Sequence, residues 1–259
     1  MSSQTIALFR FLMLGIMGRR LWVLIGILLA VALIAAGFIG ELSIINGDAI
    51  VAAFIADFLR YSLVLLALLI IASNVAEDYE FRQFERLLTM PLSRWQYIAA
   101  QVLVIACLSL MLVLPVLLML SIFAPVGASF YWAVALWLEL FLVGVLGLLA
   151  ILSLEKIPLA IFFSCAIYLL AKLSGLIALI VSESVKMSDD SATSKFIEWL
   201  FNAILYVIPG SHTFAENDVF FSELDKMALL GDQLVSVLIY ALLLVAISLV
   251  DFYRKEFNL

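Results

Sequence analysis

The sequence predicts an all-α fold, a polytopic membrane protein with six transmembrane helices and with both termini in the cytoplasm. Three observations predict it: the composition, six long apolar runs and the distribution of Lys and Arg. Of the 259 residues, 66% are hydrophobic and 13% are charged, whereas a soluble domain has about 45–50% apolar and about 25% charged residues. We therefore expect lipid to surround most of a single transmembrane domain over residues 1–259.

The apolar runs are long enough to cross a bilayer. A membrane-spanning helix needs about 20 mainly apolar residues to cross roughly 30 Å of hydrocarbon. The expected spans are Leu21–Gly40, Ile50–Ala76, Tyr97–Leu120, Trp132–Ser153, Pro158–Val181 and Leu234–Val250.

The orientation follows from the excess of Lys and Arg that cytoplasmic segments carry. The short loops expected outside hold no Lys or Arg, and the long external segment, residues 182–232, holds three Lys. With the N-terminus inside, the cytoplasmic basic residues are Arg10, Arg19, Arg20, Arg82, Arg86, Arg94, Lys156, Arg254 and Lys255.

The external segment predicts a short helix over Lys195–Ile208, capped by Ser194. About 14 residues are too few to span, so we expect an interfacial or re-entrant helix. His212, with Glu216 and Asp218, offers metal-ligand types. One His with two carboxylates is a weak signal, and a structural polar loop is the preferred interpretation, so we predict no metal site.

A cytoplasmic segment between the second and third spans, residues 77–94, is dense in charges of both signs. A helix here would present Phe81, Phe84 and Leu88 as one apolar ridge. Such an amphipathic helix either rests in the lipid headgroup layer or docks into a groove of another protein. Basic residues usually dominate the first kind, whereas acids match bases here, which favours docking.

The stretch from Glu80 to Gln101 resembles the segment after the second span in permeases of the ABC-2 type of ABC transporters. The residues that carry the resemblance are Glu85, Leu87, Leu88, Pro91, Ser93 and Arg94. The layout is also similar, with six spans, both termini inside and an amphipathic N-terminal segment over residues 1–20. The chain departs from the family at Arg82 and Gln83, where members often carry Gly-Thr, and at Gln101, where they carry Lys.

The resemblance implies that residues 77–94 contain a coupling helix that sits in a cleft of an ATP-hydrolysing subunit. The residues expected to contact that subunit are Arg82, Phe84, Glu85, Arg86 and Leu88. It further implies a permease subunit that forms half of a translocation pathway in the bacterial cytoplasmic membrane, pairs with a second identical or different permease subunit, and exports its substrate.

The chain itself is not expected to be an enzyme or to hold a cofactor. Its sequence has no GxxxxGK[ST] phosphate-binding loop, so ATP and magnesium would be bound by the partner subunit. No basic stripe of the kind that binds nucleic acid is present. The alternative function is a non-transporting membrane scaffold or secretion-complex component, which would show the same topology without a paired ATPase.

Two ionisable residues, Glu139 and Lys172, fall within predicted spans, where a charge is costly and needs a partner. They are equidistant from the predicted turn at Leu154–Ile157, so we expect an intramembrane ion pair. Alternatively, Lys172 snorkels to the interface and Glu139 faces a water-filled pathway. On the second span, Asp57 and Arg60 can pair three residues apart, although solvated charges near the outer boundary are the simpler interpretation.

Overall fold

The computed structural model describes residues 3–17, 21–42, 47–80, 94–187 and 226–254. These residues are almost entirely helical, and none of them lies in a strand. The helices within these ranges are α1 (Ser3–Met17), α2 (Leu21–Leu42), α3 (Gly47–Glu80), α5 (Arg94–Phe123), α6 (Val126–Leu154), α7 (Ile157–Met187) and α9 (Lys226–Arg254).

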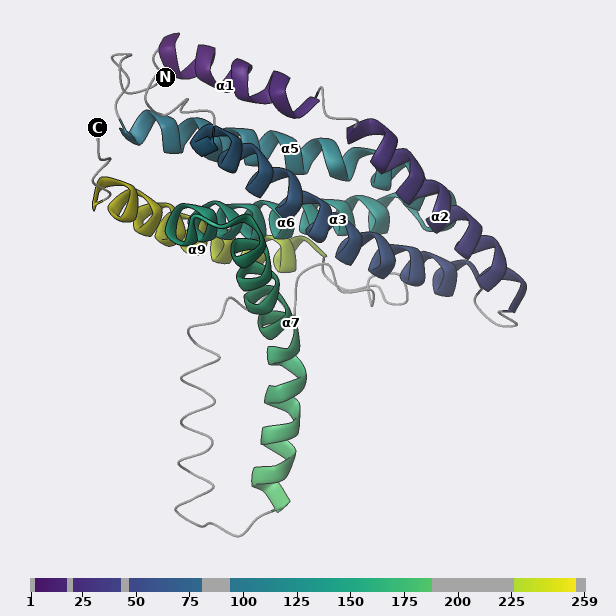
Figure 1. Ribbon diagram of the computed structural model, residues 1–259. Helices are drawn as coiled ribbons and strands as arrows, with labels where there is room; N and C mark the ends of the chain where they lie inside the picture. Colours follow the sequence, from purple (N-terminus) through teal and green to yellow (C-terminus); the bar gives the residue numbers. More distant parts are fainter. Residues whose placement is uncertain (1–2, 18–20, 43–46, 81–93, 188–225, 255–259) are drawn as a thin grey trace.

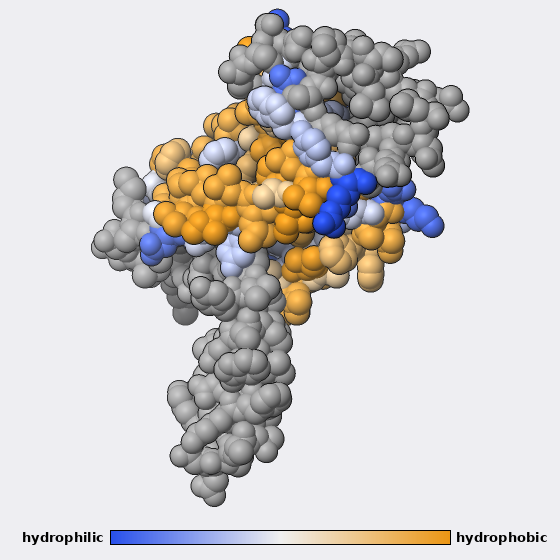
Figure 2. Space-filling view, turned by 90° about the vertical axis from the view of Figure 1, so that its left-hand side faces the viewer, coloured by the Kyte–Doolittle hydropathy of each residue, from blue (hydrophilic) through white to orange (hydrophobic). Residues whose placement is uncertain are grey.

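Five of these helices (α2, α3, α5, α6 and α9) are long and apolar enough to cross a membrane. Their large exposed side chains are mainly apolar, and Figure 2 shows such side chains spread over much of the visible described surface. The chain is therefore a multi-pass membrane protein. The predicted fifth span, Pro158–Val181, falls on α7. The side chains of α7 are described only over Ile157–Leu173, and this apolar stretch is too short to count among the five.

Helix α6 lies at the centre of the bundle. In the most apolar window of α6, 72% of residues are buried, compared with 17% in α2 and 22% in α9. It packs against α3, α5, α7 and α9. Two glycines permit this close packing, because a Cβ atom on Gly144 would lie 2.5 Å from Ile105 Cγ2 and one on Gly147 would lie 2.8 Å from Leu68 Cδ2.

Helices α3, α6 and α9 run in the same direction. From one contacting pair to the next, the residue numbers increase on both helices, which identifies parallel packing. From α6 to α3 and then from α6 to α9, these pairs are Trp132 with Arg60, Gly147 with Leu68, Tyr131 with Gln233, and Ser153 with Asp251.

Helix α1 begins and helix α9 ends at the same end of the bundle (Figure 1). Near the end of α9, Phe252 stacks on Tyr97 at the start of α5, with ring centroids 5.6 Å apart. Thr5 of α1 lines a groove together with Trp95 of α5. Because α3 runs parallel to α9, its last turn is at this end too. The same end therefore carries the helix ends that flank residues 81–93.

The sequence-predicted N-terminal amphipathic segment contains α1, which buries Leu8, Leu12 and Ile16 at four-residue spacing while Arg10 stays exposed. This stripe packs against α5 and, less extensively, α3. A hydrophobic face directed at the bundle accounts for the burial of these three residues.

A tight turn joins α6 to α7, as the sequence predicts. Glu155 adopts a left-handed conformation with φ of 58°, and its N–H donates a hydrogen bond to the Ile151 carbonyl, which closes the last turn of α6. Helix α7 starts beside α6, and its C-terminal part points away from the other helices (Figure 1).

Candidate functional site

A cluster of charged and aromatic side chains lies where α3, α6 and α7 meet. Glu139 is at its centre, 1% exposed, and lies 13 residues after the first residue of α6. At about 1.5 Å per residue this distance is about 20 Å along the helix, near the middle of its length. The cluster consists of Asp57 and Arg60 on α3, Trp132 and Glu139 on α6, and Tyr168 and Lys172 on α7.

The structure brings together the two residues predicted to pair. Nζ of Lys172 lies 2.8 Å from Oε1 of Glu139, and the Tyr168 hydroxyl donates a hydrogen bond to the same oxygen at 2.9 Å. Tyr168 and Lys172 are four residues apart, so one face of α7 presents both. A buried carboxylate is costly unless it is paired and hydrogen-bonded, and α7 supplies both contacts.

Arg60 joins the cluster from α3, and here the simpler sequence interpretation is wrong. That interpretation placed Arg60 and Asp57 in solvent, but Arg60 is only 5% exposed. The Asp57 side chain is 46% exposed, and its Oδ1 lies 3.2 Å from Arg60 Nη1, so the pair considered from the sequence is formed. The guanidinium carbon also lies 5.5 Å from the ring centroid of Trp132, within the range of a cation–π interaction.

Arg60 approaches Glu139 without a hydrogen bond between them. Its Nε is 3.8 Å from Glu139 Oε2, beyond the usual hydrogen-bond range. Among the described residues, Nε and Nη2 of Arg60, Oε2 of Glu139 and Nε1 of Trp132 are buried without a hydrogen-bond partner. Such groups are costly in a low-dielectric interior. The hydrogen-bonding capacity of the charged cluster is therefore only partly used.

Sequence reasoning missed the contributions of Trp132 and Tyr168. The spacing of Tyr168 and Lys172 on α7 was a usable signal, since residues four apart share a helix face. The position of Trp132 beneath Arg60 depends on how α3 and α6 are aligned, which no local pattern in the sequence specifies.

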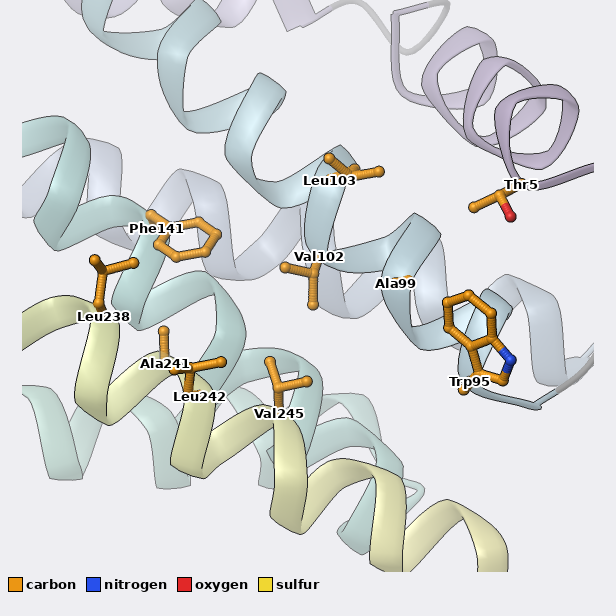
Figure 3. Close-up of a pocket in the computed structure, with 10 residues that line it drawn as sticks. All are labelled: Thr5, Trp95, Ala99, Val102, Leu103, Phe141, Leu238, Ala241, Leu242 and Val245. Carbon is orange, nitrogen blue, oxygen red and sulfur yellow. The ribbon is translucent and has the colours of Figure 1, made fainter. Parts of the chain in front are cut away.

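An apolar groove lies on another side of the bundle, where α1, α5, α6 and α9 meet. Its volume is about 330 Å³. Figure 3 shows Thr5 on α1 facing side chains of α5, with Phe141 of α6 and the α9 side chains further along. The lining residues are Thr5, Trp95, Ala99, Val102, Leu103, Phe141, Leu238, Ala241, Leu242 and Val245. This lining suits hydrocarbon and provides no charged group to orient a polar ligand.

The sequence-predicted ATPase contacts (Arg82, Phe84, Glu85, Arg86 and Leu88) lie outside the described residues, as do the polar loop around His212 and the short helix expected over Lys195–Ile208. Within the described ranges, no three His, Cys, Asp or Glu side chains gather as metal ligands would.

The chain matches no family model, and no curated protein sequence matches it either.

Proposed function

We propose that the chain is the transmembrane permease subunit of an ABC transporter of the ABC-2 type, most simply an exporter of the bacterial cytoplasmic membrane. It would form half of a translocation pathway together with a second permease subunit. Separate subunits would bind and hydrolyse ATP.

The observation that carries the proposal is the mixed-charge segment over residues 77–94, with its resemblance to a coupling helix. Its flanking helices support the proposal. Helix α3 continues to Glu80, past the apolar run, and α5 begins at Arg94, so the helix ends that flank the segment lie at one end of the bundle. That end also carries the start of α1 and the end of α9 (Figure 1), as expected if the segment and both termini are cytoplasmic.

The parallel packing of α6 and α9 supports a sixth crossing. Since both helices run in the same direction, the chain has to return between Leu154 and Lys226 to the end of the bundle where α6 begins. Helix α7 begins this return beside α6, in the range where the sequence predicts the fifth span. Six crossings with both termini inside follow if the return passes through the bilayer.

In this mechanism, the ATPase subunits move residues 77–94, and α3 and α5 transmit the movement. Helix α3 carries Arg60 and contacts α6 and α7. A displacement of α3 therefore acts directly on the charged cluster around Glu139.

The test replaces two charged side chains of the segment with neutral, polar ones. Glu85→Gln combined with Arg86→Gln should abolish co-purification of an ATPase with the tagged full-length chain, while membrane insertion is retained. The matched control is Glu155→Gln combined with Lys156→Gln, an exposed acidic and basic pair in the α6–α7 turn at the same end of the bundle. The control should retain the ATPase. If no ATPase co-purifies with the natural sequence, the scaffold function takes the place of this proposal.

A further inference from the structure

The two carboxylate oxygens of Glu139 differ in what they contact. Oε1 receives both contacts from α7, from Nζ of Lys172 at 2.8 Å and from the Tyr168 hydroxyl at 2.9 Å. Oε2 has no hydrogen-bond partner among the described residues and faces Arg60 Nε at 3.8 Å. One oxygen is therefore held by α7, and the other is directed towards α3 without being bound.

The guanidinium of Arg60 shows the complementary asymmetry. Its Nη1 lies 3.2 Å from Asp57, whereas Nε and Nη2 are buried and have no partner within the described part of the chain. The N–H groups of Nε and Nη2 lie along one edge of the guanidinium and point in the same direction, which is the geometry that binds a carboxylate through two parallel hydrogen bonds. Arg60 thus has two N–H donors without an acceptor, and Oε2 of Glu139 is an acceptor without a donor.

The separation between these groups is small. A charge-assisted N–H···O bond has a donor–acceptor distance of about 2.8 Å, so a shift of about 1 Å would close the 3.8 Å gap. A rotation of the carboxylate is of this scale. It would move Oε1 away from Lys172 and Tyr168, so the contacts to α7 and the two-bond contact to Arg60 compete.

Helix α7 is the element whose contacts can be released. It packs on α6 and α3, and its C-terminal part projects from the bundle (Figure 1). The main buried core includes Leu63, Ala67 and Ile71 of α3 and Leu140 and Val143 of α6, whereas the described side chains of α7 contribute only Ala160 and Tyr168 to it. A movement at the cluster is therefore expected to separate α7 from α3 and α6.

We infer that Glu139 is a carboxylate with two alternative sets of partners, and that this exchange forms a latch for α7. In the described conformation, Lys172 and Tyr168 hold α7 against α6. When α7 withdraws, Glu139 turns to the Nε–Nη2 edge of Arg60. The exchange keeps the carboxylate paired in both arrangements, which removes the large cost of leaving a lone charge inside the membrane, and such a pair of discrete arrangements is what a conformational switch requires. This inference does not depend on the transporter proposal.

The experiment observes the Arg60 side chain directly. The full-length chain is labelled with 15N-arginine and placed in lipid nanodiscs, and the Nε–H resonance of Arg60 is identified by its loss in Arg60→Lys. Lys172→Met removes the competing cation, so we expect the Arg60 Nε–H proton resonance to move downfield as a carboxylate hydrogen bond forms. Lys172→Gln should cause the same shift, which guards against a failure of Lys172→Met to fold.

The control for that shift is Lys156→Met, which makes the same replacement at an exposed lysine at the start of the α6–α7 hairpin. It should leave the Arg60 resonance unchanged. An unchanged resonance in both Lys172 variants would overturn the inference. So would a downfield resonance already present in the natural sequence, because Arg60 would then be bonded to Glu139 from the outset.

A thermal measurement gives an independent check. In the natural sequence, Arg60→Met removes the contacts to Asp57 and Trp132 but no hydrogen bond to Glu139, and its loss in the midpoint of thermal unfolding is the reference value. In the Lys172→Met background, Arg60 becomes the remaining cationic partner of Glu139, and Arg60→Met should lower the midpoint at least twice as much. Equal losses in the two backgrounds would contradict an exchange of partners.

Discussion

The two sides of α6 differ in polarity: one is charged and the other is apolar. Towards α3 and α7, it presents Glu139 within a network of charged groups and aromatic rings. Towards α5 and α9, it contributes Phe141 to a groove suited to hydrocarbon. The difference indicates where a functional site lies. An apolar surface is explained by contact with lipid, whereas charged groups inside a membrane are energetically costly and point to a functional site.

The largest expected effect comes from removing the centre of the charged side. Glu139→Ala would leave Lys172 and Arg60 buried without their shared carboxylate, and breaking a buried pair in this way costs about 3–5 kcal/mol. We expect the variant to fail to assemble or to unfold at a much lower temperature in detergent. Wild-type thermal stability would show that the cluster contributes nothing to the fold.

A smaller loss is expected where α6 is most closely packed. In Gly144→Ala, the new Cβ would lie 2.5 Å from Ile105 Cγ2 and 2.9 Å from Ile71 Cδ1, and overpacking of this kind costs about 1–3 kcal/mol. The matched control is Gly26→Ala on α2, where nothing lies within 4 Å of the added atom. Thermal unfolding should separate the two variants, and equal midpoints would contradict close packing at Gly144.

Tyr168→Phe removes one hydrogen bond to Glu139 and keeps the ring that packs edge-on against Tyr61. Hydrogen bonds between membrane helices contribute about 1–2 kcal/mol in model peptides. The unfolding midpoint should therefore fall by less than in Glu139→Ala. A loss as large as in Glu139→Ala would mean that Tyr168, and not Lys172, is the main partner of the carboxylate.

The smallest effect is expected on the groove side. Leu242 is 70% exposed, and Leu242→Ala changes only surface that lipid can cover. Substitutions of exposed residues away from special features usually change stability by about 0.5 kcal/mol or less. A measured change above that would show that another part of the assembly covers the groove.

The sequence predicted what depends on local patterns. Apolar runs predicted the five helices that are long and apolar enough to cross a membrane. The equal sequence distances of Glu139 and Lys172 from the α6–α7 turn predicted that the two would be neighbours, as they are at 2.8 Å. What it could not predict depends on how helices distant in sequence are aligned. Arg60 looked like a solvated residue near a membrane boundary, and only the parallel packing of α3 against α6 buries it over Trp132.

The proposed function depends on contact between residues 77–94 and an ATP-hydrolysing partner. Its most direct test places the photo-crosslinking residue benzoylphenylalanine at Phe84 in the full-length chain and irradiates native membranes. We expect a crosslinked product that contains a protein with a phosphate-binding loop, and no such product from the same residue at Phe130, an exposed phenylalanine at the opposite end of α6. Crosslinks from position 84 to lipid alone would contradict the claim.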